Sequence, residues 1–292
     1  MKPYIKTFTG TGKINFLIIS GVHGNELTPL AATKLLINSL SLNGLDITTF
    51  KSITIIQGAN VDAIKKGTRE GNNKTNTNDL NRAFSDEDYE PTELLKEHIL
   101  KNHVVIDVHS SPNILETYLF DIPLYRDKIR FKKINFVLRK LYYKNKFIVQ
   151  PVFRYSFNKT IKSYVNSFKN KVGLTLELNG IDKIDFESAE KGANILIDTI
   201  HQFSRKIKNR MQFLISPIKY VYSDCEGLYC NILIKGFQVG NNNIIGHVKD
   251  IDFSYRSSVK SNCCGILLNT PESRYVKDQD FIAMIQPRII WP

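Results

Sequence analysis

Apolar residues recur along the first two thirds of the chain in short runs that alternate with longer amphipathic segments. The short runs are rich in β-branched residues and are bounded by polar residues or glycine, which predicts buried strands. They lie at 14–20, 51–57, 103–108 and 171–178, with weaker candidates at 117–120 and 146–150. Apolar positions at helical spacing predict helices over 27–39, 91–101, 126–143 and 188–207. Strands that alternate with helices predict an α/β fold whose sheet is mostly parallel.

The pattern changes near residue 210. From there on the chain shows short alternating runs separated by glycines and other turn residues, and no segment with a good helical period. Such a pattern is typical of a small all-β domain. The sequence therefore predicts two domains, an α/β domain over residues 1–210 and a β-domain over 211–292.

One polar segment follows the first predicted strand directly. Residues 21–26 are Gly-Val-His-Gly-Asn-Glu, and a predicted helix begins at Leu27. His23 and Glu26 are three residues apart, close enough to hold one ion from the same turn. A catalytic zinc ion needs three protein ligands and an open fourth position. We expect the third ligand to come from another strand end, and His109 is the candidate.

A carboxylate also interrupts an apolar strand. Glu177 lies within residues 171–178, where a charge without a partner is costly to bury. An unrecognised salt bridge is one explanation, and a general base beside a metal ion is the explanation that we favour. His23, His109 and Glu177 all lie at or just beyond the carboxyl ends of predicted strands, which is where α/β sheets bind their ligands.

Several short motifs together resemble a known family. Residues 14 to about 205 resemble the succinylglutamate desuccinylase and aspartoacylase family, which are zinc hydrolases of the carboxypeptidase-like superfamily. The resemblance rests on segments that occur in the family's order: 21–26, Gly-Thr-Arg at 67–69, Asp-Leu-Asn-Arg at 79–82, Asp-Val-His-Ser at 107–110 and Thr-Leu-Glu-Leu at 175–178. It implies a zinc carboxypeptidase-like fold, with a mixed, mostly parallel sheet flanked by helices.

The resemblance also implies roles for individual residues. The residues that match His23, Glu26 and His109 hold one zinc ion in that family. The residue that matches Glu177 acts on the attacking water. Those that match Arg69, Asn81 and Arg82 bind the carboxylate of the substrate and help to polarise the scissile carbonyl.

The C-terminal part resembles the small barrel-sandwich domain of deacylase-like members of the family. In that family the β-domain can lend a tyrosine to the substrate pocket, and Tyr275 is the candidate here. A tyrosine exposed on the surface of a strand is an equally good explanation.

The substrate itself does not carry over from the resemblance. Aspartoacylase has an arginine ahead of the catalytic-glutamate strand, whereas residues 159–167 contain lysines and no arginine. Lysine cannot form the bidentate hydrogen bonds that arginine makes with a carboxylate. We expect hydrolysis of the amide bond of an N-acyl amino acid or a related small carboxylate. A zinc carboxypeptidase acting on peptides or peptidoglycan stem peptides is the alternative.

The positive charge is concentrated in one segment. The net charge is +12, and residues 126–171 contain fourteen Lys or Arg and one acid. Such a segment favours an anionic small substrate, a nucleic acid, an anionic surface, or simply a solvated face. No RNA-binding signature accompanies it. We therefore expect a small anionic acyl-amino-acid substrate, and keep a non-catalytic protein that binds nucleic acid or an anionic surface as a second alternative.

Compartment and assembly are weakly constrained by the sequence. There is no run of eighteen apolar residues, so we expect no membrane partner. The first residues lack a stretch of signal-peptide type, and the four cysteines are too sparse for a disulfide framework, so we expect a cytoplasmic protein. The oligomeric state stays open, a homo-oligomer included.

Overall fold

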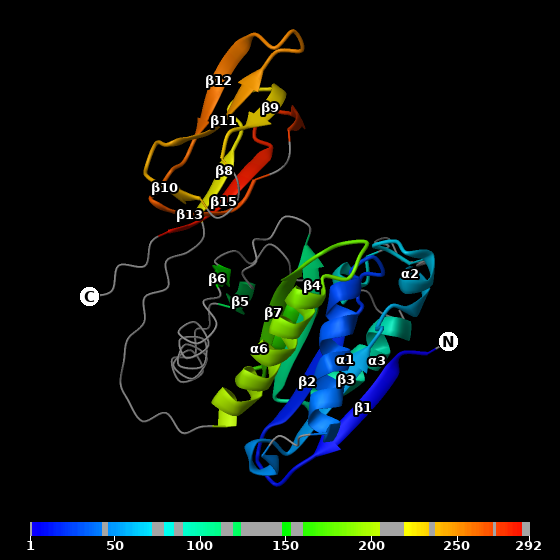
Figure 1. Ribbon diagram of the computed structural model, residues 1–292. Coiled ribbons are helices and arrows are strands. Elements are labelled where there is room, and N and C mark those ends of the chain that lie inside the picture. The colour runs from blue at the N-terminus through cyan, green and yellow to red at the C-terminus, as the bar shows by residue number, and fades with distance from the viewer. Residues whose placement is uncertain are drawn as a thin grey trace, which may run out of the picture. The chain divides into compact units, whose positions relative to one another are not determined.

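The computed structural model describes ten stretches of the chain: 2–42, 46–71, 79–84, 90–111, 119–123, 148–152, 160–204, 219–233, 237–270 and 273–287. The chain divides into two compact units, the first reaching Gln212 and the second running from Phe213 to Pro292 (Figure 1). The boundary predicted near residue 210 lies outside the described residues, as does the helix predicted over 126–143 and most of the basic segment.

The first unit is built on a seven-stranded sheet with the order β1-β3-β2-β4-β7-β5-β6. Its strands are β1 (Tyr4–Thr9), β2 (Asn15–Ser20), β3 (Ser52–Gln57), β4 (Val104–Ser111), β5 (Leu119–Pro123), β6 (Ile148–Val152) and β7 (Val172–Asn179). The central strands β3, β2, β4 and β7 are parallel, whereas β1 is antiparallel to β3 and β5 to β7. The predicted mixed, mostly parallel α/β fold is confirmed.

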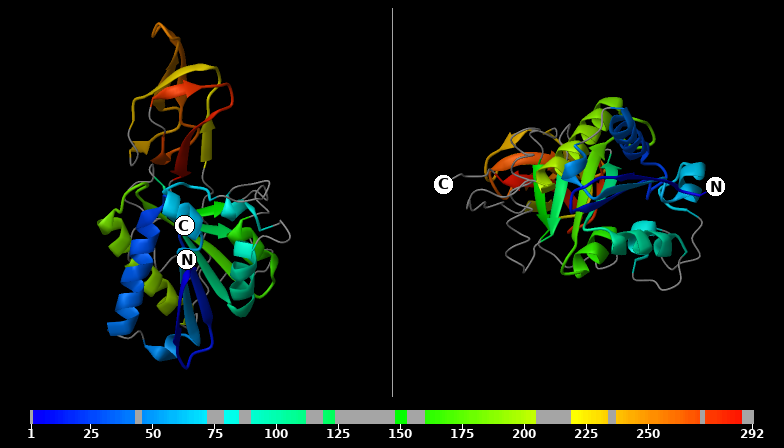
Figure 2. Two further views of the ribbon diagram at one scale, coloured as in Figure 1. Left: turned by 90° about the vertical axis from the view of Figure 1, so that its right-hand side faces the viewer. Right: turned by 90° about the horizontal axis from the view of Figure 1, so that it is seen from below.

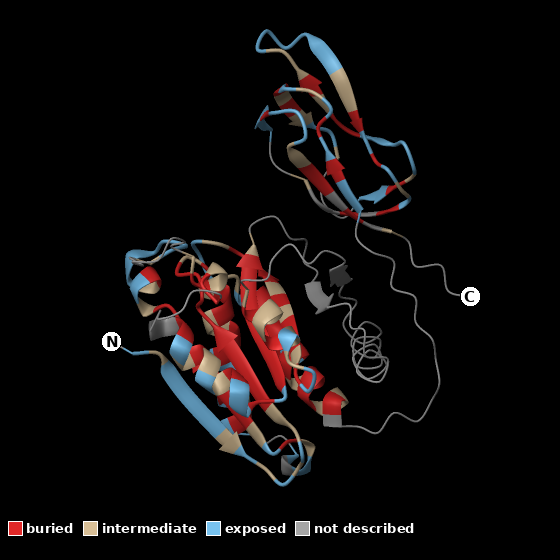
Figure 3. Cartoon of the chain, turned by 180° about the vertical axis from the view of Figure 1, so that it is seen from behind, coloured by how far each residue is buried: buried red, intermediate tan, exposed pale blue. Residues whose placement is uncertain are grey.

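Helices cover both faces of this sheet, as Figure 2 shows. Helices α1 (Leu27–Leu42) and α6 (Phe186–Ser204) pack together on one face, where the Phe203 ring meets Phe16 of β2 edge to face. Helices α3 (Glu90–Lys101) and α5 (Ile161–Ser167) lie on the other face and share a core with Leu17 and Val105. The central strands are therefore buried on both sides (Figure 3), which explains their continuous apolar runs.

One strand and two short helices of the first unit were not predicted. Strand β1 is an exposed edge strand and lacks an apolar run. Helices α2 (Val61–Lys66) and α5 have six and seven residues, too few to show a helical period. Both are defined by their caps, since Asn60 accepts a hydrogen bond from the Ala63 N–H and Thr160 from the Ser163 N–H. Two short 3-10 turns, η1 (Ile47–Thr49) and η2 (Leu80–Arg82), complete the described helical segments.

The second unit consists of two four-stranded antiparallel sheets, with the orders β10-β13-β15-β8 and β12-β11-β9-β14. Its strands are β8 (Lys219–Tyr222), β9 (Gly227–Asn231), β10 (Gln238–Val239), β11 (Ile244–Lys249), β12 (Tyr255–Lys260), β13 (Gly265–Asn269), β14 (Arg274–Val276) and β15 (Phe281–Pro287). Tyr229, Val248 and Ile285 are among the fully buried residues of its core. This arrangement confirms the predicted small all-β C-terminal part. None of the helices in the described stretches is both long and apolar enough to cross a membrane.

Candidate metal centre

The segment 21–26 is held in place by helix α2. A side chain at Gly24 would put its Cβ 2.0 Å from the carbonyl carbon of Ala63, so only glycine allows the two backbones to approach this closely. The close approach brings His23 and Glu26 to the same side of the loop. His109 reaches them from β4, two residues before the end of that strand.

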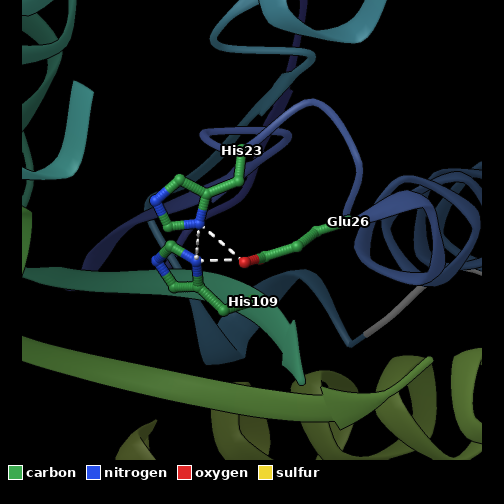
Figure 4. Close-up of side chains that lie close together, drawn as sticks. All are labelled: His23, Glu26 and His109. Carbon is green, nitrogen blue, oxygen red and sulfur yellow. Dashed lines mark hydrogen bonds and ion pairs between the residues drawn. The ribbon is translucent and has the colours of Figure 1, made fainter. Parts of the chain in front are cut away.

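The three predicted ligands converge (Figure 4). The Nδ1 atoms of His23 and His109 lie 3.2 Å apart. The Glu26 carboxylate places Oε1 2.7 Å from the first nitrogen and Oε2 3.0 Å from the second. All three side chains are buried. Residues separated by more than eighty positions in the chain thus present one ligand atom each to a common point.

The opposite nitrogen of each imidazole is held by a second carboxylate. His23 donates from Nε2 to Asp79 Oδ1 over 3.0 Å, and His109 donates from Nε2 to Asp107 Oδ2 over 2.7 Å. A carboxylate only accepts hydrogen bonds, so each of these bonds needs a proton on Nε2, which leaves Nδ1 as the nitrogen that can bind a metal ion. Carboxylates behind imidazoles are also what orients histidines that bind metal ions.

The spacing fits a tetrahedral metal ion. Two ligand atoms about 2.0–2.1 Å from zinc lie about 3.3 Å from each other in that geometry. The two Nδ1 atoms are 3.2 Å apart, and the three ligand atoms all lie within 4.8 Å of one another. The His23, Glu26 and His109 donor set therefore suits zinc and leaves a fourth position for a water or a substrate.

The charges around the cluster favour a cation. Burial works to raise the pKa of Glu26, but the charge of His109 and hydrogen bonds to both imidazoles together lower it. Burial opposes charge on His109, yet Asp107 and Glu26 raise its pKa well above the ordinary value. Burial also works to raise the pKa of Asp79, but contacts with His23 and Arg69 lower it to about 2. The carboxylates thus stay ionised and surround the centre with negative charge.

Arg69 reaches the cluster through the end of helix α2. Gly67 ends the helix in the left-handed region, at a φ of 63°, and its N–H bonds back to the Ile64 carbonyl. The chain then turns so that Arg69 donates from Nη1 to Glu26 Oε1 over 3.2 Å and from Nη2 to Asp79 Oδ2 over 3.5 Å. The Arg69 side chain is 45% exposed, so it contacts the cluster and remains partly open to solvent.

Asn81 and Arg82 lie in η2, which Asp79 caps by accepting the Asn81 N–H. The Asn81 amide nitrogen lies 3.3 Å from His109 Nε2, and its amide oxygen accepts the Ile161 N–H over 2.9 Å. Arg82 donates from Nη1 to the Asn81 carbonyl over 3.2 Å. The structure therefore brings Asn81 to the cluster and Arg82 beside Asn81, and their role in binding substrate stays a prediction.

Glu177 occupies the neighbouring strand at the same level as His109. The two residues are paired in register between β4 and β7, so their side chains leave the same face of the sheet. Glu177 is half-buried. Burial raises its pKa, as do the charges of Glu26 and Asp107, while the imidazoles of the cluster lower it. A raised pKa suits a group that must both accept and return a proton.

Tyr275 belongs to the second unit, on β14. It is 51% exposed, and its hydroxyl donates to Glu226 Oε1 over 2.7 Å. Its role in binding substrate stays a prediction.

Two residues of the site were not singled out from the sequence: Asp79 and Asp107. Asp107 had a recognisable signal, because residues two apart on a strand share a face and Asp107 therefore lies beneath His109. Asp79 stands in the motif 79–82, but its contact with His23 crosses 56 positions of the chain and no local pattern predicts it.

Fold and site together define an α/β protein with a candidate metal centre at the carboxyl edge of its sheet. The model of the succinylglutamate desuccinylase/aspartoacylase catalytic domain matches residues 13–202. The chain belongs to this family. It is a desuccinylase/aspartoacylase-type hydrolase.

Solved structures share the fold over most of the chain. The product-bound ectoine utilization protein EutE (DoeB) of Ruegeria pomeroyi is 16% identical, with a TM-score of 0.72 over 97% of this chain and 88% of that one. A succinylglutamate desuccinylase of Silicibacter sp. TM1040 is 18% identical, with a TM-score of 0.69 over 96% and 87%. A metallo-carboxypeptidase of Burkholderia cenocepacia is 16% identical, with a TM-score of 0.57 over 68% and 60%. No curated protein matches the chain by sequence.

Proposed function

We propose that this protein is a zinc-dependent hydrolase that cleaves the amide bond of an N-acyl amino acid or a related small carboxylate. The observation that carries the proposal is the convergence of His23, Glu26 and His109 with Glu177 in register beside them. Family membership supports the reaction class. When bound, zinc acts as a Lewis acid that lowers the pKa of water toward neutrality and polarises a carbonyl.

Glu177 is the general base of this proposal. It takes the proton of the attacking water and passes it to the leaving amine. Burial and the nearby Glu26 and Asp107 charges raise its pKa, which makes it basic enough for the first transfer and acidic enough for the second.

The polar edge of the cluster is suited to an anionic substrate. Arg82 and Asn81 hold the substrate carboxylate and so fix the scissile carbonyl beside the centre. Arg69, whose guanidinium already touches Glu26, offsets the charge that develops on the carbonyl oxygen. The small acyl-amino-acid partner, one zinc ion per chain and a cytoplasmic location are part of the same proposal.

The direct test is Glu177→Gln. We expect kcat to fall by about a hundredfold to ten-thousandfold, the usual contribution of a general base, with zinc retained. Metal content is measured by atomic absorption, and activity on a panel of N-acetyl, N-succinyl and N-formyl amino acids. Glu190→Gln, at an exposed position of α6, is the matched control. A Glu177→Gln protein that keeps most of its activity would remove Glu177 from the mechanism.

The same panel beside short peptides distinguishes a deacylase from a carboxypeptidase. We expect the acyl amino acids to be cleaved faster. Turnover confined to peptides would move the protein to the carboxypeptidase alternative.

A further inference from the structure

The sheet face that carries Glu177 is covered by helix α5. Side chains alternate along β7, so Gly173, Thr175 and Glu177 share this face. In the neighbouring strand Asp107 is paired with Thr175, one step below the level of Glu177. Two carboxylates therefore lie close together under α5, with Glu26 of the metal cluster beyond them.

Gly173 lets the helix come close to this face. A Cβ at Gly173 would lie 3.0 Å from both the Lys162 carbonyl oxygen and the Val165 Cβ. Ile161 and Val165 are fully buried, which fixes the rotation of the helix, and the Ile161 N–H is tied to Asn81. The backbone of Lys162 is thereby held over β7, at the start of the row that leads to Glu177.

The charge of Lys162 interacts with other charges of the site. Its side chain is partly buried, and burial lowers the pKa of Lys162 to about 8, while the charges of Glu177 and Asp107 oppose this decrease and Arg82 adds to it. Asp107 Oδ1 is buried and accepts no hydrogen bond within the described part of the chain. A cation at this place compensates carboxylates that burial and mutual repulsion would otherwise destabilise.

We propose that Lys162 is a positioning residue for Glu177, compensating its charge and keeping its carboxylate turned toward the metal centre. On this proposal Lys162 acts through Glu177 rather than on the substrate. The catalytic consequence rests on the proposed function, whereas the pairing of the two side chains does not.

The pairing is tested by urea unfolding of a double-mutant cycle at matched metal content. Lys162→Met should lower the urea midpoint, and the decrease should be smaller when Glu177 is already Gln. Equal decreases in the two backgrounds would overturn the proposal. If Lys162→Met does not fold, the cycle is measured with Lys162→Gln, which keeps a polar side chain. Lys169→Met, at an exposed position just after α5, should shift both backgrounds equally.

The positioning role is tested by steady-state kinetics. Lys162→Met should lower kcat by about tenfold or more with little change in KM, because a displaced base slows the reaction without weakening binding. Lys162→Arg should recover most of the lost kcat. A raised KM with unchanged kcat would make Lys162 a substrate-binding residue and overturn the proposal. Because the unfolding cycle needs no activity, it tests the pairing of Lys162 and Glu177 independently of the hydrolase function.

Discussion

The two imidazoles of the cluster owe their orientation to carboxylates that do not touch the shared centre. Asp107 is 1% exposed and accepts from His109, and Asp79 accepts from His23. Each bond fixes which ring nitrogen carries the proton and increases the basicity of the other. The geometry of the candidate metal site therefore depends on residues outside the set of candidate ligands.

Asp107→Asn is expected to weaken metal binding by about tenfold to a hundredfold, the usual cost of losing a carboxylate behind a metal-binding histidine. The amide keeps the size of the side chain but removes the charge that holds the His109 proton. The dissociation constant for zinc is measured by competition with a fluorescent chelator. Asp62→Asn, at an exposed position of α2, should leave it unchanged. Equal affinities of Asp107→Asn and the unmodified protein would contradict the role of Asp107.

Helix α2 shapes the metal site although it supplies no ligand. It packs against Gly24 on one side and, through Gly67 at its end, directs Arg69 to Glu26 on the other. The motifs 21–26 and 67–69 are thus two halves of one local structure. Their glycines have different roles. Gly24 allows a close backbone contact, and Gly67 adopts a left-handed turn.

Gly24→Ala should destabilise the first unit and weaken metal binding together. The added Cβ would lie 2.0 Å from the Ala63 carbonyl carbon, so the loop or α2 must move, at a cost of about 1–3 kcal/mol for overpacking. Thermal unfolding and zinc affinity are measured on the same samples. Gly240→Ala meets only the side chain of Asn243 and serves as the control. Unchanged zinc affinity in Gly24→Ala would show that the loop tolerates the shift.

The chain as a whole consists of two compact units, and all the residues of the metal cluster belong to the first. A ligand that binds only the folded form stabilises the part that holds it. A bound metal ion should therefore raise the stability of the first unit.

Removal of the metal with a chelator should lower the unfolding temperature of one calorimetric transition. Ligand at about a thousand times its dissociation constant contributes about 4 kcal/mol, which gives the scale of the effect. The other transition is assigned with Gly227→Ala, since Gly227 has a φ of +154° and its Cβ would lie 2.6 Å from the Lys249 carbonyl oxygen. A single transition, or two that shift equally with the chelator, would contradict an effect of the metal confined to the first unit.

Local patterns were sufficient for much of this molecule. The strands β2, β4 and β7 and the helices α1, α3 and α6 were predicted to within a few residues, because continuous apolar runs and helical periods depend on each segment alone. The pair His23 and Glu26 was accessible for the same reason, being one turn apart. Short elements such as α2 and α5 were not predicted, because six or seven residues are too few to show a helical period. The start of each of these helices is set by its capping residue.

Pairing between distant segments could not be read from any one of them. Strand order places β4 beside β7, and their register sets Glu177 opposite His109. Asp79 meets His23 across 56 positions of the chain, and Gly173 allows α5 to pack closely on β7. These contacts arise from sheet order, register and helix packing, which are properties of the folded chain. An isolated stretch of sequence specifies on which face of its element a side chain lies, but not which residue of another element it contacts.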